Sequence, residues 1–225
     1  MEVQYPIRIN KYLRDKGLAS RREADKLVEG GLVFVNGKRV ENGTMVNEKD
    51  KVLVKTPKGQ LAKEYKYLAY YKPRNLPTQD LTGKQSVITD WKDRGLYPIG
   101  RLDKSSEGLL LLTNDGRFAR QVLSDSKRYE KEYVVAVKEP LRPGIVRIFE
   151  SGMETQALGK LLPAKARLIN ANRIQVVLNE GKHHQIRIML SELGYTISSL
   201  KRVRIGDIKI DNLKPGETRP LKIFI

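Results

Sequence analysis

Apolar residues in the first part of the chain follow two different periods. Between residues 20 and 31 they recur at helical intervals, after a capping pattern and before a glycine pair: Ser20 and Glu23, then Ala24, Leu27 and Val28, then Gly30-Gly31. Residues 32–35 and 38–40 enclose an Asn36-Gly37 turn and predict a hairpin, and residues 51–54 predict a further strand. We therefore expect a small unit in which helices are followed by a sheet.

A polar segment that contains a proline and a glycine, residues 56–64, interrupts this pattern and is typical of a linker. We place a domain boundary there, with domains at residues 1–60 and 65–225. Beyond it, helical patterns cover 118–123 and 184–193, and short strand-like runs are separated by turns, at residues 65–71, 108–113, 132–137, 173–178 and 203–210. The fold class predicted is α+β, with the larger domain built on a mixed, mainly antiparallel sheet flanked by helices.

Composition narrows what such a chain does. Its 43 Lys and Arg residues outnumber 26 Asp and Glu, and the net charge of +17 is typical of a protein that binds a polyanion such as RNA. We find neither an apolar run long enough to span a membrane nor a signal-peptide core, so we expect a cytoplasmic protein with no membrane partner. The chain has no cysteine, which excludes disulfides, thiolate catalysis and thiolate metal sites.

Imidazole metal ligands are also scarce, because the chain has only two histidines, His183 and His184. We expect both to be loop residues or phosphate contacts without a catalytic role, and we expect no metal and no cofactor. A glycine-rich phosphate loop of the G-x-x-x-x-G-K type is absent as well. The candidates for chemistry are then one carboxylate, one phenol and several arginines.

The carboxylate is Asp103, which lies in a polar loop just before the apolar run Leu109 to Leu112. Such a run predicts a buried strand, so the loop presents Asp103 from a rigid support. An isolated aspartate in a loop is most often a turn residue. The surrounding motif is what distinguishes this one.

The amino-terminal unit resembles the alpha-L RNA-binding motif. The resemblance rests on one series of residues in order: Arg8, Asn10-Lys11, Leu13, Gly17 to Ala24, Gly31, Val33 and Val35-Asn36-Gly37. It implies binding to structured RNA, for which we select the basic residues Arg8, Lys11, Arg21 and Arg22 as phosphate contacts. The same cations also fit an ordinary solvated helix face.

The larger domain resembles the pseudouridine synthases that modify bacterial ribosomal RNA. The motif begins Gly100-Arg101-Leu102-Asp103 and continues through Ser106 and residues 108–114. Three further segments support it in order along the chain: Lys72-Pro73, Lys131-Glu132-Tyr133, and Glu180-Gly181-Lys182-His183-His184-Gln185-Ile186-Arg187. Three positions depart from the family's pattern, since Tyr71, Asn75 and Ile188 stand where an asparagine, a glycine and an arginine are usual. These departures leave the target position open.

The resemblance implies a cofactor-free isomerisation of uridine to pseudouridine, with Asp103, Tyr133 and Arg187 as catalytic residues. Asp103 either attacks C1′ or removes a sugar proton to give a glycal, and the sequence does not choose. Arg187 would keep the carboxylate ionised, and Tyr133 would lie near the base, where a proton leaves C5. Tyr133 also fits a strand residue on the core face.

Three further cations in the matched motifs, Arg101, Lys72 and Lys182, are expected to bind RNA. Arg101 would either fill the gap left by a flipped uridine or contact a phosphate. The expected partner is ribosomal RNA or a pre-ribosomal particle, bound by a monomer. The segment Tyr129 to Tyr133 favours large-subunit RNA. Small-subunit RNA, a non-catalytic ribosome-assembly factor and a metal-dependent RNA enzyme are the alternatives.

Overall fold

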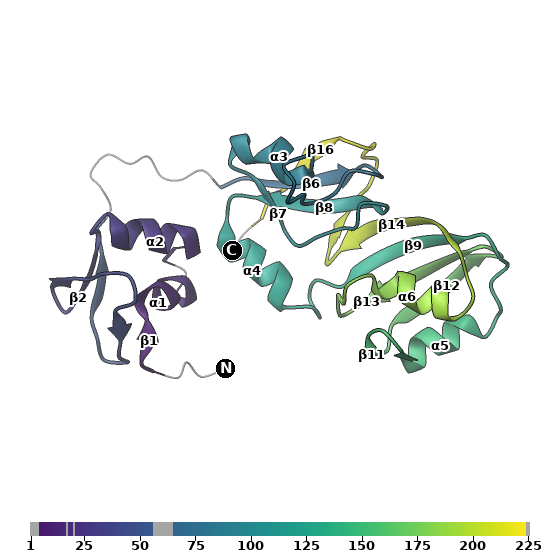
Figure 1. Ribbon diagram of the computed structural model, residues 1–225, viewed down its shortest axis with the longest axis horizontal. Helices are drawn as coiled ribbons and strands as arrows, with labels where there is room; N and C mark the ends of the chain where they lie inside the picture. Colours follow the sequence, from purple (N-terminus) through teal and green to yellow (C-terminus); the bar gives the residue numbers. More distant parts are fainter. Residues whose placement is uncertain (1–4, 17, 20, 56–64, 224–225) are drawn as a thin grey trace. The chain divides into compact units, whose positions relative to one another are not determined.

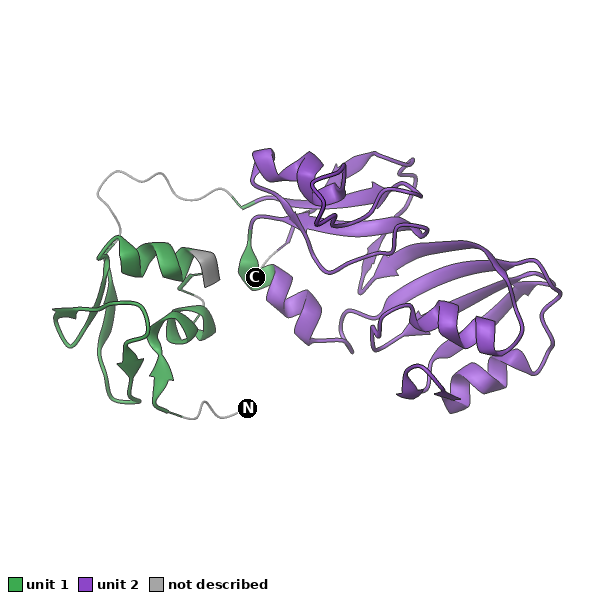
Figure 2. Cartoon of the chain, in the orientation of Figure 1, with its two compact units in different colours: residues 1–65, 115–118 green, residues 66–114, 119–225 purple. Residues whose placement is uncertain are grey.

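The chain forms two compact units in a computed structural model, residues 1–65 with 115–118, and residues 66–114 with 119–225 (Figure 2). The structure describes residues 5–16, 18–19, 21–55 and 65–223. The expected cap residue Ser20, the whole of the expected linker (residues 56–64), and the side chains of Arg21 and Arg22 lie outside this description. Within the described part, no helix is long and apolar enough to cross a bilayer.

The smaller unit has its helices first and its hairpin second, as the apolar pattern predicts. Its elements are β1 (Ile7–Arg8), α1 (Ile9–Asp15), α2 (Arg21–Glu29), β2 (Val33–Val35), β3 (Lys38–Arg39), β4 (Met45–Val46) and β5 (Val52–Val54). Strands β3, β2 and β5 form one antiparallel sheet, and β1 pairs with β4. Apolar residues from α1, α2 and both sheets share one core, which fixes the helices against the strands.

The larger unit is built on one nine-stranded sheet. Its main path runs β12-β13-β9-β14-β8-β6-β16, with β15 beside β14 and β7 beside β8. The strands are β6 (Tyr67–Lys72), β7 (Tyr97–Pro98), β8 (Glu107–Thr113), β9 (Lys131–Val137), β12 (Lys165–Asn170), β13 (Arg173–Leu178), β14 (Ile197–Ile205), β15 (Ile208–Lys209) and β16 (Thr218–Pro220). The pairing of β14 with β8 is parallel and the other pairings are antiparallel. This confirms the α+β class with a mixed, mainly antiparallel sheet.

Short helices complete this unit. They are α3 (Val87–Trp91), the 3₁₀ helix η1 (Lys92–Arg94), α4 (Gly116–Ser124), α5 (Ile145–Ser151) and α6 (Gln185–Glu192), and β10 (Glu154–Thr155) pairs with β11 (Gly159–Lys160). Helices α5 and α6 lie against strands β9, β12 and β13 (Figure 1), where Phe149 and Met189 are fully buried in a common core. That core holds α6, and with it Arg187, in a fixed position.

One predicted strand is wrong in its extent. The run 203–210 was expected to be a single strand, whereas β14 begins at Ile197 and the chain turns back after Ile205 into β15. The turn contains Gly206, whose φ of 56° lies in the left-handed region. A bulge in β14 between Arg202 and Arg204 also breaks the alternation that marks a strand in a sequence.

The junction of β8 and β14 requires a residue without a side chain. Gly108 has a φ of 105°, and a Cβ atom there would lie 2.3 Å from the carbonyl oxygen of Arg202. Glycine therefore permits the two backbones to approach at their parallel pairing, where Arg202 is the register partner of Gly108. This contact sets the position of the loop that precedes β8.

Candidate active site

Asp103 lies in the loop between β7 and β8, and this loop is held at several points. The hydroxyl of Thr78 donates to the carbonyl oxygen of Leu102 at 2.7 Å and accepts from its amide at 3.0 Å. The amide of Ser106 donates to the carbonyl oxygen of Asp103 at 3.1 Å. Leu109 to Leu112, which follow, have no exposed surface. The Asp103 side chain, 25% exposed, thus projects from a fixed backbone.

Arg187 meets this carboxylate from α6. Its Nε atom lies 3.4 Å from Oδ2 of Asp103, and its Nη2 atom donates to the hydroxyl of Ser106 at 2.7 Å. Ser106 is fully buried and lies in the same loop as Asp103, so this hydrogen bond fixes the guanidinium relative to the carboxylate. A cation at this distance favours the ionised form of a carboxylate. The fold therefore brings together Asp103 and Arg187, two predicted catalytic residues that lie 84 positions apart in the sequence.

His184 is a second neighbour of Asp103, and the sequence analysis gave it no role. Its Nε2 atom lies 3.4 Å from Oδ1, the carboxylate oxygen that does not face Arg187. The residue precedes α6 with a φ of 57°, which is uncommon for a side chain other than glycine, and its ring stacks on His183 at 3.8 Å. The left-handed backbone of His184 could not be predicted from the sequence, because the pattern of apolar residues carries no signal for it.

The same three side chains offer metal-ligand atoms. One atom each from Asp103, His183 and His184 lies within 4.8 Å of the others, a donor set that suits zinc. The guanidinium of Arg187 on the same carboxylate opposes a second positive charge there. The expectation that the histidines are not ligands remains a prediction.

Tyr133 lies on β9 and lines the same cavity as Asp103, a space of about 840 Å³. Its side chain is partly buried against the core formed by α5, α6 and the sheet. In the ladder it stands opposite Val176 on one side and Arg202 on the other. All three residues selected for catalysis thus border one cavity, large enough for a nucleotide.

Lys72 corrects an expectation. It was selected as an RNA contact, yet it has no exposed surface, and its ammonium donates to the carbonyl oxygens of Pro73 at 2.8 Å and Leu76 at 2.7 Å. A third, longer contact at 3.5 Å reaches the carbonyl oxygen of Lys104. Burial lowers the pKa of Lys72 to about 8, against an opposing effect of the Asp103 charge. Lys72 therefore ties the loop after β6 to the loop of Asp103 and does not face RNA.

The other cations selected for RNA binding differ in exposure and in whether their charged groups already bind the protein. Lys182 borders the cavity, but its ammonium donates to the carbonyl oxygens of Leu158 at 3.0 Å and Lys160 at 2.8 Å. Arg101 is exposed at the edge of the cavity. In the smaller unit Arg8 and Lys11 are exposed as well, which suits a phosphate contact.

Two cavity residues were not selected from the sequence at all, Arg202 and Lys131. Arg202 is 5% exposed, and its Nε atom donates to the carbonyl oxygen of Leu109 at 2.7 Å. Its Nη1 atom reaches the carbonyl oxygen of Arg101 at 3.4 Å, so it connects β14 with both ends of the Asp103 loop. Lys131 opens β9 two residues before Tyr133. Arg202 stands in a stretch rich in charge, where the sequence gives no reason to single out one cation, and Lys131 was noted only as part of the motif that ends at Tyr133.

Comparisons with known proteins agree with this geometry. Residues 66–192 match the family model for RNA pseudouridylate synthase, and residues 7–52 match the S4 domain. The ribosomal large subunit pseudouridine synthase B of Bacillus subtilis (strain 168) is 36% identical over 225 residues, which cover 95% of this chain and 91% of the relative.

A second curated relative is the dual-specificity RNA pseudouridine synthase RluF of Escherichia coli (strain K12). It is 34% identical over 96% of this chain and 75% of its own length. A crystal structure described as a pseudouridylate synthase superposes with a TM-score of 0.69 at 26% identity, over 96% of each chain. Both resemblances noted in the sequence are thereby confirmed, one for each part of the chain.

Proposed function

Because the chain belongs to the RNA pseudouridylate synthase family, with an S4 domain ahead of the synthase region, we propose that it isomerises one uridine of ribosomal RNA and that Asp103 is the catalytic carboxylate. The observation that carries this proposal is the pairing of Asp103 with Arg187 inside the cavity that Tyr133 also lines. Large-subunit RNA is the preferred substrate, which the name of the Bacillus subtilis relative supports.

The reaction begins at the sugar. The bond from C1′ to N1 breaks, and Asp103 either forms a bond to C1′ or takes the proton from C2′ to give a glycal. Both routes need an ionised carboxylate at the start. The guanidinium of Arg187, fixed by buried Ser106, favours that form and restrains the carboxylate.

The second half of the reaction concerns the base. The detached uracil turns within the cavity and C5 bonds to C1′, while the Asp103–C1′ bond breaks or, in the glycal route, C2′ takes its proton back from Asp103. The proton on C5 then leaves and N1 takes up a proton, which gives the neutral product and the free carboxylate. Tyr133, which borders the cavity from β9, is proposed to lie beside the base and to assist this proton transfer. No external water enters the balance, so no cofactor is required by the chemistry proposed here.

The remaining cations are assigned to RNA. Arg101 at the cavity edge is proposed to contact a phosphate or to occupy the space that a flipped uridine leaves. Arg8 and Lys11, with Arg21 and Arg22, are proposed to dock the amino-terminal domain, residues 1–60, on folded RNA. We propose that the protein acts as a monomer in the cytoplasm, where pre-ribosomal particles assemble.

The direct test uses purified wild type and Asp103→Asn with transcripts of the large- and small-subunit RNA, followed by carbodiimide mapping of pseudouridine. We expect the wild type to modify one site of the large-subunit transcript, and the variant to bind that RNA equally well and form no product. Product on the small-subunit transcript alone would reassign the substrate. An Asp103→Asn variant as active as the wild type would refute the catalytic assignment.

A further inference from the structure

The cavity around Asp103 carries far more positive than negative charge. Six Lys or Arg residues border it, namely Arg101, Lys104, Lys131, Lys182, Arg187 and Arg202, against the carboxylates of Asp103 and Glu180. Asp103 is engaged by Arg187 and His184. Glu180 accepts hydrogen bonds from the amide of Leu162 at 3.0 Å and from Gln185 at 2.7 Å. Neither carboxylate balances the cations that enter from the sheet.

The bulge in β14 explains why the sheet supplies cations to this side. Arg202 stands opposite Tyr133 and Arg204 opposite Glu132, so the extra residue between the two arginines turns them to opposite faces. Side chains alternate along β9, which places Lys131 and Tyr133 on one face and Glu132 on the other. The cavity face therefore receives Lys131 and Arg202 together.

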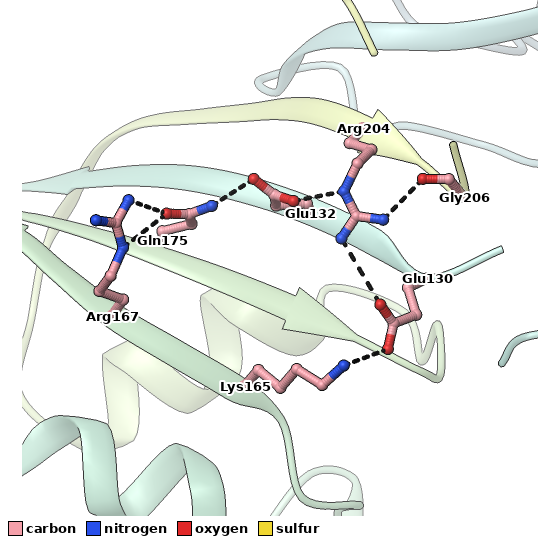
Figure 3. A network of polar contacts seen from close by, with 7 residues as sticks. All are labelled: Glu130, Glu132, Lys165, Arg167, Gln175, Arg204 and Gly206. Atoms are coloured by element: carbon pink, nitrogen blue, oxygen red, sulfur yellow. Dashed lines mark hydrogen bonds and ion pairs between the residues drawn. The ribbon is translucent and has the colours of Figure 1, made fainter. Parts of the chain in front are cut away.

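The acidic residues next to these cations are committed to the other face (Figure 3). Arg204 donates to Glu132 at 2.6 Å and lies 3.7 Å from Glu130, and Lys165 bonds Glu130 at 3.0 Å. Gln175 bonds the second oxygen of Glu132. This network satisfies both glutamates, so it leaves Lys131 and Arg202 without a counter-charge from β9.

Lys131 and Arg202 each have a hydrogen-bond donor without a partner among the described residues. Among the described residues, the ammonium of Lys131 has no hydrogen-bond or ion-pair partner, and the buried Nη2 atom of Arg202 has none either. Burial and then the charge of Arg202 lower the pKa of Lys131. A partly buried ammonium beside a buried guanidinium is unfavourable for folding unless an anion binds there. Such an arrangement is expected where negative charge arises during a reaction.

The position of Lys131 and Arg202 indicates which negative charge they would stabilise. RNA phosphates are met at the surface, where Arg101 and Lys104 are exposed at the cavity edge. Lys131 and Arg202 instead adjoin Tyr133, are partly or fully buried, and border the part of the cavity assigned above to the base. Breaking the C1′–N1 bond sends its electron pair to N1, and the resulting anion is shared with the O2 and O4 atoms of uracil.

Resting on the function proposed above, we propose that Lys131 stabilises the uracil anion released from C1′. Its place beside Tyr133 orients it toward the base, and the buried charge of Arg202 adds to its effect. In the carboxylate route the lost N1 bond is replaced by a bond from Asp103 to C1′; in the glycal route it is replaced by the C1′=C2′ double bond. When C5 bonds to C1′, the negative charge passes back to Asp103, whose bond to C1′ breaks or whose proton returns to C2′. The proton of C5 then leaves, N1 takes up a proton, and the product is released.

The test compares Lys131→Met with wild type in single-turnover reactions on a stem-loop cut from ribosomal RNA around the uridine that mapping identifies. The methionine keeps the length of the side chain and removes the charge. We expect the maximal rate to fall on the order of 100-fold, the loss found when one preorganised group facing a developing anion is removed, with the half-saturating RNA concentration unchanged. Lys131→Arg is expected to recover most of the rate.

A second substrate separates leaving-group stabilisation from other roles. In 4-thiouridine the sulfur disperses negative charge, so the base departs more easily and needs less help. The defect of Lys131→Met is therefore expected to shrink at least several-fold on the same stem-loop with 4-thiouridine at the target. An equal defect on both RNAs, or a defect confined to the half-saturating concentration, would overturn the proposal in favour of a phosphate contact.

Two controls keep the result interpretable. Lys127→Met, a change of the same kind at an exposed position, is expected to leave the maximal rate unchanged. Thermal unfolding of Lys131→Met should occur at or above the wild-type temperature, because a partly buried charge without a partner in the protein is removed. A lower unfolding temperature would contradict the claim that this charge is uncompensated. Failure of the proposed function would be recognised separately, because wild type itself would then form no pseudouridine.

Discussion

The carboxylate of Asp103 has a different neighbour on each of its oxygens, Arg187 on Oδ2 and His184 on Oδ1. The arginine is fixed by a buried serine, whereas the histidine is largely exposed and stacks on its neighbour. The permanently charged partner is thus the rigid one. A carboxylate that attacks or accepts a proton benefits from this order, because the rigid cation holds it in one orientation.

One prediction at the scale of single residues concerns Lys72. Its pKa is about 8 in the folded chain, against 10.5 for an ordinary lysine, mainly because of burial. Between these two pH values the unfolded chain holds the proton and the folded chain does not, so unfolding takes up a proton. Rising pH then disfavours unfolding, and the contribution of Lys72 to the free energy of unfolding increases from about pH 8 toward 10.5.

This linkage is measured as the difference in unfolding temperature between wild type and Lys72→Met from pH 7 to 10. Methionine does not titrate, so shared effects of alkali cancel in the difference. We expect wild type to gain on the variant as the pH rises above 8. A difference that is constant, or that moves the other way, would show that Lys72 keeps an ordinary pKa in its buried position.

At the scale of elements, the apolar pattern alone predicted α2, α4, α6, the hairpin of the small unit and most strands of the large sheet. It missed β7, β12 and β16 entirely, and it missed the first half of β14, because polar residues and a bulge interrupt the alternation there. The pairing of Asp103 with Arg187 came from the resemblance to known synthases, since nothing in their spacing indicates a contact. His184 and Arg202 were missed because a left-handed residue and a bulge, which local sequence does not reveal, direct them toward the cavity, and Lys131 stands in a matched motif but was given no role of its own.

The junction of β8 and β14 gives the prediction that belongs to this scale. Gly108→Ala would place a Cβ atom 2.3 Å from the carbonyl oxygen of Arg202, at a φ of 105° that only glycine adopts freely. We expect the free energy of unfolding to fall by about 3 kcal/mol or more, since backbone strain and overpacking add. Denaturant unfolding of the purified variant measures this loss.

Gly144→Ala is the matched control, because a Cβ atom there meets nothing within 4 Å and the backbone of Gly144, with a φ of −69°, is open to any residue. Its stability should stay within about 1 kcal/mol of the wild type. If both alanine variants unfolded at the same denaturant concentration, the close approach of β8 and β14 would not be a real constraint.

At the scale of the whole molecule, we expect the cations behind the net charge of +17 to serve two proposed roles, one in docking RNA and one in the reaction. Arg8 and Lys11 are exposed on the smaller unit, where cations act on RNA through phosphates. The double variant Arg8→Glu with Lys11→Glu is expected to weaken RNA binding roughly 10-fold and to reduce the slope of log affinity against log salt by about 2.

Filter binding at several salt concentrations measures both quantities. The control is Lys38→Glu with Lys49→Glu, which makes the same change of charge at exposed positions in the later, β-structured part of the unit. A long-range effect of net charge would weaken both double variants equally. Only a larger loss in the first supports a docking surface on α1.

The measurement that tests the account most directly is pseudouridine mapping of ribosomal RNA from cells that lack this protein, complemented with wild type or with Asp103→Asn. We expect one site of large-subunit RNA to lose its pseudouridine in the absence of the protein and to regain it with wild type only. Restoration by Asp103→Asn would contradict the catalytic role of the aspartate, and ribosomal RNA unchanged by loss of the protein would contradict the assigned substrate.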